Sequence, residues 1–291
     1  MCIRDREYMI YYNIELIRIK KGLKINELID GIMSRATYHN FKTGKHEISY
    51  LDFFKLVKRL NLMPDELGEV VVDETTNMFK KYMNQLKDLS DQGEVNSLLA
   101  LKREMNQNRN GLPNKDLLVE LVDSHIHQLQ GQTFDLNPGS LVSQYLFGAE
   151  GWTQYEKIIF NLSLPFLRSE LIDIYLDRIL STKMDDQDHR HYGDGHFRLV
   201  IRALIIFIEG KDYGMIKKWS KKVEEMPLDP SFVFEISLKK LFHLLVDYIL
   251  DHHLSSLDKS KRMVKLLEEL DCQPYADNLT NIITFVEDHY A

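Results

Sequence analysis

From Ser34 to Lys45 the chain reads SRATYHNFKTGK, and this stretch decides the fold. Ser34 is a good N-cap for a helix, because its hydroxyl oxygen accepts a hydrogen bond from a backbone N–H of the first turn. Tyr38 and Phe41 follow at a spacing that places both on one face of that helix. We therefore expect a short helix that buries Tyr38 and Phe41 and ends near Gly44.

A second helix is expected directly upstream. Residues 24–30 read KINELID, in which Ile25, Leu28 and Ile29 recur at helical spacing, and Gly31 follows where the helix must stop and turn. Two short helices joined in this way form a helix-turn-helix motif, whose second helix enters the major groove of DNA. The residues left to face the groove are Arg35, Ala36, Thr37 and Asn40.

This stretch resembles the XRE (Cro/repressor-type) helix-turn-helix family, whose pattern runs Ser-x-x-Thr-hydrophobic-x-x-aromatic-x-x-Gly. The matching residues are Ser34, Thr37, Tyr38, Phe41 and Gly44. Residues 48–62, with residues 64–67 behind them, look like the helix that closes such domains. We therefore predict a DNA-binding domain over residues 9–67. A structural helical hairpin is the alternative.

Individual roles in DNA binding follow from side-chain chemistry. Arg35 is the best candidate base reader, because a guanidinium can bond a guanine in two places, and Asn40 can read adenine or contact phosphate. Lys42 and Lys45 are expected to bind phosphate. Residues 9–67 hold ten Lys/Arg against seven Asp/Glu, so the chain's net charge of −7 arises outside this head. A basic head on an acidic body is expected where the head meets phosphate.

Length and composition limit the class of protein. At 291 residues and 44% hydrophobic content, the chain can form two domains with real cores. It has no uncharged apolar run of about eighteen residues, so no membrane partner is expected. Residues 1–8 alternate in charge where the apolar part of a signal peptide would lie, which predicts a cytoplasmic protein. Cys2 and Cys272 stand at opposite ends and suggest reduced thiols.

Beyond a short linker at residues 68–74, the pattern predicts helix after helix over residues 75–291. After the first three, the expected segments run at about 140–148, 152–164, 168–182, 194–209, 212–226, 230–253, 257–271 and 274–289. Helices joined by short turns, paired with a period in the thirties, are typical of an α-solenoid of tetratricopeptide type. The expected fold is therefore all-α, a helix-turn-helix domain followed by helical hairpins, with an irregular helical bundle as the alternative for the body.

One segment of the body carries a second resemblance. Residues 152–161 read WTQYEKIIFN and are preceded by the aromatic residues of the segment 145–147. They are similar to the C-terminal domain of the Rgg/GadR/MutR family, in which a helix with these aromatic residues, Tyr-Glu and Asn recurs. The resemblance implies a cytoplasmic, homodimeric transcription regulator whose tetratricopeptide-like body binds a short imported peptide pheromone.

Three polar residues are candidates for holding such a peptide. Asn161 lies in an otherwise apolar segment, and its amide can bond an N–H and a C=O of a peptide at once. Arg198 and Arg202 are one helical turn apart, so they share a face and can meet a peptide carboxylate. The alternative is that both arginines pair with acids on neighbouring helices.

No catalytic, metal or cofactor site is predicted. Residues 185–196 read DDQDHRHYGDGH, but Arg190 and His196 stand where a calcium loop needs glycine and glutamate. The histidines of this segment suit a transition metal, yet a polar loop between helices is the favoured interpretation. The sequence lacks the motifs of serine hydrolases, phosphate-binding loops and zinc proteases, so we expect no enzyme.

These patterns predict a sequence-specific DNA-binding transcription regulator whose activity is controlled by a short peptide pheromone bound in the helical-repeat domain. Its expected partners are double-stranded DNA, the signalling peptide and a second copy of the chain. The alternative is a helical-repeat adaptor that grips a partner protein and has no physiological DNA binding.

Overall fold

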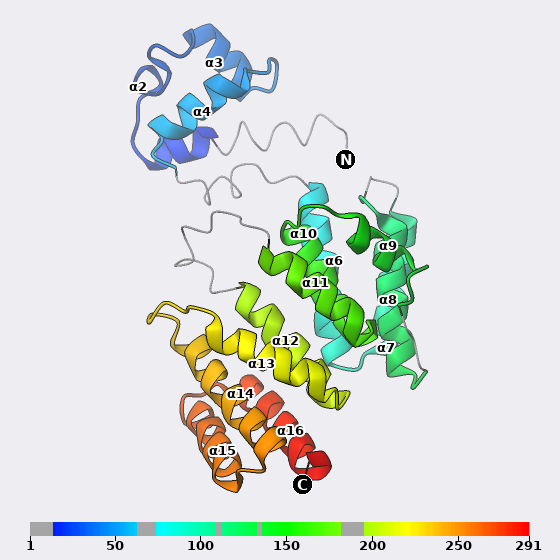
Figure 1. The fold of residues 1–291 in the computed structure, drawn as a ribbon. Helices are drawn as coiled ribbons and strands as arrows, with labels where there is room; N and C mark the ends of the chain where they lie inside the picture. Colours follow the sequence, from blue (N-terminus) through cyan, green and yellow to red (C-terminus); the bar gives the residue numbers. More distant parts are fainter. Residues whose placement is uncertain (1–13, 63–73, 109–111, 133–135, 182–194, 291) are drawn as a thin grey trace. The chain divides into compact units, whose positions relative to one another are not determined.

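The computed structural model describes residues 14–62, 74–108, 112–132, 136–181 and 195–290. Within these ranges every regular element is a helix, which confirms the expected all-α fold (Figure 1). The chain forms two compact units, one of residues 1–88 and 103–115 and the other of residues 89–102 and 116–291. The predicted linker lies outside the described residues up to residue 73, so the division into residues 9–67 and 75–291 stays a prediction.

The head contains a helix at residues 14–20, followed by α2 (Ile25–Ile29), α3 (Arg35–Lys42) and α4 (Tyr50–Arg59). α2 packs on both α3 and α4. The side chains that these helices bury together are Ile14, Leu28, Ile29, Tyr38, Phe41, Leu56, Val57 and Leu60. The predicted burial of Tyr38 and Phe41 is thus confirmed.

A tight turn separates α2 from α3, as the sequence predicts. Gly31 adopts a φ of +67°, in the left-handed region where a side chain is strained and glycine is not. The structure therefore explains why this turn needs a glycine.

The helices that follow match the predicted order. They are α6 (Glu74–Asp91), α7 (Val95–Gln107), α8 (Lys115–Leu129), α9 (Leu141–Gly148), α10 (Gln154–Ser163), the 3₁₀ turn η1 (Leu164–Phe166), α11 (Ser169–Ser181), α12 (Gly195–Glu209), α13 (Tyr213–Glu225), α14 (Val233–Asp251), α15 (Leu254–Glu269) and α16 (Gln273–Tyr290).

The largest differences from the expected bounds are three residues each, at the start of α14 (Val233, expected at 230) and at the start of α15. α14 ends at Asp251 because His252 takes a left-handed conformation with φ of 54°. α15 then begins at Leu254, three residues before the expected start at 257. The αL residue is a histidine rather than a glycine, so the sequence carried no ordinary stop signal there.

Helices of the second unit pack as neighbours in sequence. From α11 to α16 each helix packs on the next, and α12 and α14 also contact the helix two further along. This nearest-neighbour arrangement is that of helical repeats. The last helix is also tied to α12, because the Tyr290 hydroxyl donates a hydrogen bond to the Ile208 carbonyl oxygen at 2.6 Å.

Candidate functional site

The predicted recognition helix, α3, has well-defined ends. The Ser34 hydroxyl oxygen accepts a hydrogen bond from the Thr37 N–H at 3.0 Å, which confirms the predicted N-cap. At the other end, the Thr43 hydroxyl donates to the His39 carbonyl oxygen at 2.8 Å. The side chains between these ends are therefore presented by a short, capped helix.

The exposed face of α3 carries most of the predicted DNA contacts. Arg35, Ala36 and Asn40 are exposed, and Lys45 is exposed just beyond the helix. Thr37 and Lys42 are half-buried, and the Thr37 hydroxyl shares a hydrogen bond of 2.8 Å with Ser34. Thr37 is therefore partly committed to the helix cap.

His39 also lies on this face, although it is not among the DNA contacts predicted from the sequence. Its side chain is exposed, and it stands three residues after Ala36 and one before Asn40. Its position on the helical wheel could have identified it, because residues three apart on a helix are neighbours.

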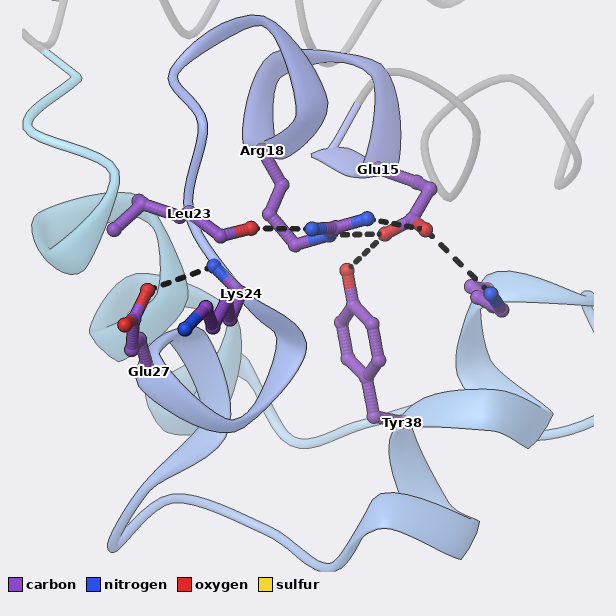
Figure 2. Close-up of polar contacts among 7 residues, drawn as sticks. Glu15, Arg18, Leu23, Lys24, Glu27 and Tyr38 are labelled. Atoms are coloured by element: carbon purple, nitrogen blue, oxygen red, sulfur yellow. Dashed lines mark hydrogen bonds and ion pairs between the residues drawn. The ribbon is translucent and has the colours of Figure 1, made fainter.

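A carboxylate from the helix at residues 14–20 holds α3 away from its exposed face (Figure 2). The Tyr38 hydroxyl donates to Glu15 Oε2 at 2.8 Å, and Lys42 Nζ lies 3.5 Å from Glu15 Oε1. Arg18 bonds both carboxylate oxygens, with Nε at 2.8 Å and Nη2 at 3.0 Å. The hydrogen bond from Arg18 holds the pKa of Glu15 at about 2, so the carboxylate is ionised at neutral pH.

The second candidate site centres on α10 of the second unit. Much of the sequence motif that predicted this site stabilises the fold. Glu156 is 7% exposed, and it accepts hydrogen bonds from the Thr153 N–H at 2.8 Å and from the Tyr145 hydroxyl at 2.6 Å. The rings of Trp152 and Phe160 pack 5.4 Å apart between centroids. These five residues stabilise the start of the helix, and none of these contacts involves Asn161.

Asn161 has an unused acceptor. Its Oδ1 is buried and has no hydrogen-bond partner among the described residues. A buried amide oxygen without a donor is costly, of the order of 1–3 kcal/mol, and is uncommon in folded proteins. A bound molecule with an N–H group would satisfy it.

A buried histidine joins α10 to α6 and α8. His125 Nε2 is 3.0 Å from the Leu162 carbonyl oxygen, and Nδ1 is 2.6 Å from the Ser90 hydroxyl. A carbonyl only accepts, so Nε2 carries the hydrogen and the Ser90 hydroxyl donates to Nδ1. Burial lowers the pKa of His125 to about 4, which keeps the imidazole neutral at physiological pH.

The two predicted arginines have different surroundings. Arg198 pairs with Glu235 of α14, with Nε 2.9 Å from Oε1, so the alternative of pairing with a neighbouring acid holds for this residue. Arg202 is half-buried, and burial lowers its pKa while the charge of Asp91 raises it. Arg202 also interacts electrostatically with His125. Arg202 thus acts by its charge on His125, whose Nε2 bonds the Leu162 carbonyl oxygen one residue after Asn161, whereas Arg198 is engaged by Glu235.

A surface cavity lies elsewhere in the second unit. It has a volume of about 260 Å³ and is lined by residues of α12, α13 and α14, with Leu204 and Phe242 among its apolar walls. None of the three predicted ligand-binding residues lines it.

For a metal site and for a membrane-spanning helix, the structure speaks only for the described residues. Within the described ranges no three His, Cys, Asp or Glu side chains gather as a metal site would require, and the segment 185–196 lies outside them up to residue 194. Nor is any helix of these ranges long and apolar enough to cross a membrane.

The fold resembles that of several solved structures. The SHP pheromone receptor Rgg2 of Streptococcus dysgalactiae superposes with a TM-score of 0.75 at 17% identity, covering 94% of this chain and 98% of that one. A protein described as a transcriptional regulator from Listeria monocytogenes EGD-e gives 0.78 at 19% identity, with coverage of 97% and 98%. PrgX in its complex with cCF10 gives 0.66 at 12% identity, with coverage of 96% and 92%.

These structural matches show the fold, a helix-turn-helix domain followed by a helical-repeat domain. No curated protein sequence matches the chain. Residues 98–281 match the family described as "HTH-type transcriptional regulator Rgg, C-terminal domain". Because this match covers more than half of the sequence, the chain belongs to the Rgg family of transcriptional regulators.

Proposed function

We propose that this regulator binds duplex DNA in a sequence-specific manner through α3. The observation that carries the proposal is the exposed face of α3, where Arg35 and Asn40 project from a capped helix whose opposite face is buried. These are the side chains that read guanine and adenine in the major groove. Lys45, just beyond the helix, would contact phosphate, and Lys42, whose Nζ lies 3.5 Å from Glu15 Oε1, would share its charge between that carboxylate and phosphate.

Two copies are needed for useful specificity. One recognition helix reads too few base pairs to single out an operator, so a homodimer on an inverted repeat is expected. Such a protein acts in the cytoplasm. It is not an enzyme, because the family to which it belongs consists of transcriptional regulators.

Salt dependence tests DNA binding against the adaptor alternative. Duplexes that the protein selects from a random library should bind with an affinity that falls steeply as salt is added, because phosphate contacts release counterions. A protein–protein adaptor predicts that no duplex is selected at moderate salt.

We further propose that a short peptide controls this activity from the second unit. Asn161 Oδ1 supports this, since a peptide N–H would supply the donor that the buried oxygen lacks. The similar structures Rgg2 and PrgX are described, respectively, as a pheromone receptor and as a complex with cCF10. A peptide alters transcription only if it binds one arrangement of the protein better than another.

Arg202 is the better anchor for the terminal carboxylate of the peptide. Arg198 is already paired with Glu235, which is 3% exposed, and removing one partner of a buried pair leaves an uncompensated charge. Burial lowers the pKa of the half-buried Arg202, and the opposing effect of the Asp91 charge is the smaller of the two. An entering carboxylate would therefore offset the cost of burying Arg202.

Thermal melts with synthetic peptides encoded next to the gene test this proposal. A specific ligand must raise the melting temperature in a concentration-dependent way. Asn161→Ala should remove that shift while leaving DNA selection by the free protein unchanged. If none of these peptides shifts the melt, or if Asn161→Ala leaves a shift intact, ligand capture at this site is wrong and DNA binding still stands.

A further inference from the structure

Glu15 contacts two side chains of α3, and Figure 2 shows its carboxylate between them and Arg18. Tyr38 and Lys42, the two residues of α3 that reach Glu15, are four positions apart and therefore lie one turn apart on the same face. Two attachments along one face fix the rotation of a helix about its own axis, which packing of apolar side chains alone fixes less sharply. Asn40 lies on the other side of this helix, whereas Arg35, one turn before Tyr38, is exposed along the attached side.

Glu15 is itself held in place. Arg18 clamps both of its oxygens, and Arg18 Nη1 donates in turn to the Leu23 carbonyl oxygen in the turn before α2. The carboxylate is therefore a fixed point on the N-terminal helix rather than a mobile surface group. Its side chain is 19% exposed, so water competes little for its oxygens.

Both partners of the Glu15–Tyr38 hydrogen bond are in the right protonation state. The Glu15 carboxylate is ionised because its pKa lies at about 2. Burial and the neighbouring carboxylate raise the pKa of Tyr38, so its hydroxyl keeps the proton that it donates. A hydrogen bond to an ionised acceptor is roughly twice as strong as one between neutral groups.

Rotation of a recognition helix has a large effect at its side-chain tips. A helix with its side chains is about 10–12 Å across, so a turn of about 20° moves a tip by about 2 Å. Hydrogen bonds to base edges tolerate only a few tenths of an ångström. Phosphate contacts through long lysine side chains adapt to the same rotation, because they act as flexible point charges.

We propose that Glu15 and Tyr38 are positioning residues for base recognition: their hydrogen bond sets the rotation of α3 so that Arg35 and Asn40 meet base edges in one register. The inference rests on the proposed DNA binding and goes beyond it, because it assigns sequence discrimination to two residues that do not touch DNA.

Tyr38→Phe tests this, because the ring keeps its place in the core and only the hydroxyl is lost. The duplex is one selected from a random library by the wild-type protein, and its affinity is compared with that for a scrambled duplex of equal length. We expect the ratio of the two affinities to fall about tenfold, the size of a displaced base contact, while affinity for the scrambled duplex is unchanged. Tyr50→Phe, which removes a hydroxyl from a tyrosine 73% exposed on α4, is the matched control and should keep the full ratio.

A merely structural role predicts a different result. If the Tyr38 hydroxyl only stabilises the fold, Tyr38→Phe should have a lower melting temperature but the same ratio of affinities for the selected and the scrambled duplex, measured on folded protein. That result would overturn the proposal. If Tyr38→Phe does not fold, Glu15→Gln replaces it, since the amide loses the charge that orders Arg18 and Tyr38. If the wild-type protein selects no duplex, DNA binding itself fails; if it selects one and both variants discriminate equally well, only the positioning role fails.

Discussion

Glu235 of α14 is buried and accepts a hydrogen bond of 2.9 Å from Nε of Arg198, one turn before Arg202 on α12. The Arg198 guanidinium also lies 5.8 Å from the centre of the Phe234 ring. Arg198 thus joins α12 to α14 through a charged hydrogen bond and an aromatic contact. This pairing separates two arginines that look equivalent in the sequence.

Arg198→Ala should destabilise the second unit, because it leaves the Glu235 carboxylate buried without its partner. Arg198 is half exposed, so the expected loss is about 1–3 kcal/mol rather than the full cost of a buried pair. Chemical denaturation measures it. The double variant Arg198→Ala/Glu235→Gln should recover part of the loss, and a double variant as unstable as the sum of both single changes would contradict this explanation.

Glu15 should make the stability of the head depend on pH in the acid range. Its pKa falls from 4.5 to about 2 on folding, so the folded head releases this proton more readily than the unfolded chain. The stabilisation is complete above about pH 4.5 and is lost as the pH falls towards 2. We expect a difference in unfolding free energy between wild type and Glu15→Gln of up to about 3 kcal/mol at pH 7, shrinking below pH 4.5. A difference that does not change between pH 7 and pH 3 would show that the charge of Glu15 is not what stabilises the head.

Local patterns were enough to predict the helices. Ser34 and Gly31 are signals that act within a few residues, and the apolar spacing around Tyr38 and Phe41 reports directly which face is buried. The structure confirms each of these. The end of α14 at Asp251 was missed because it depends on an αL histidine, His252, which no local rule selects.

The contacts that give the candidate sites their character could not be predicted in this way. Tyr38 meets Glu15 across 23 positions, and Arg198 meets Glu235 across 37. Such pairs depend on how helices pack, which periodicity within one helix does not encode. Asn161 could be named from its polar side chain in an apolar segment, but its unpaired buried oxygen is visible only in the structure.

Arg35 and Lys45 should differ in how they contribute to DNA binding. Arg35→Ala should cost about 1–3 kcal/mol on the selected duplex and relax the base preference at one position, because it removes a contact to a base edge. Lys45→Ala should weaken binding to all duplexes alike and reduce the slope of affinity against salt by about one. Fluorescence anisotropy on a panel of singly substituted duplexes measures both effects, and equal losses on every duplex would show that the assigned roles are wrong.

His39 should also affect base preference, because it is exposed between Ala36 and Asn40 on the face of α3 that would meet the groove. His39→Ala is expected to change the preferred base at one or two positions of a library selected by the variant, with little change in melting temperature. The same selection with Lys20→Ala, an exposed residue outside α3, should return the wild-type sequence. Identical selected sequences for wild type and His39→Ala would remove His39 from the candidate interface.

The terminal carboxylate of a bound peptide should be read by Arg202 and not by Arg198. If a peptide is found that raises the melting temperature, its C-terminal amide should bind the wild-type protein about ten- to a hundredfold more weakly, since a charge-assisted hydrogen bond is lost. Arg202→Gln should bind the acid and the amide equally and weakly, because the variant no longer distinguishes them. Arg198→Gln should keep the preference for the acid, because that arginine serves Glu235. Titration calorimetry with both peptides gives the four affinities, and a preference for the acid that persists in Arg202→Gln but disappears in Arg198→Gln would reverse the assignment.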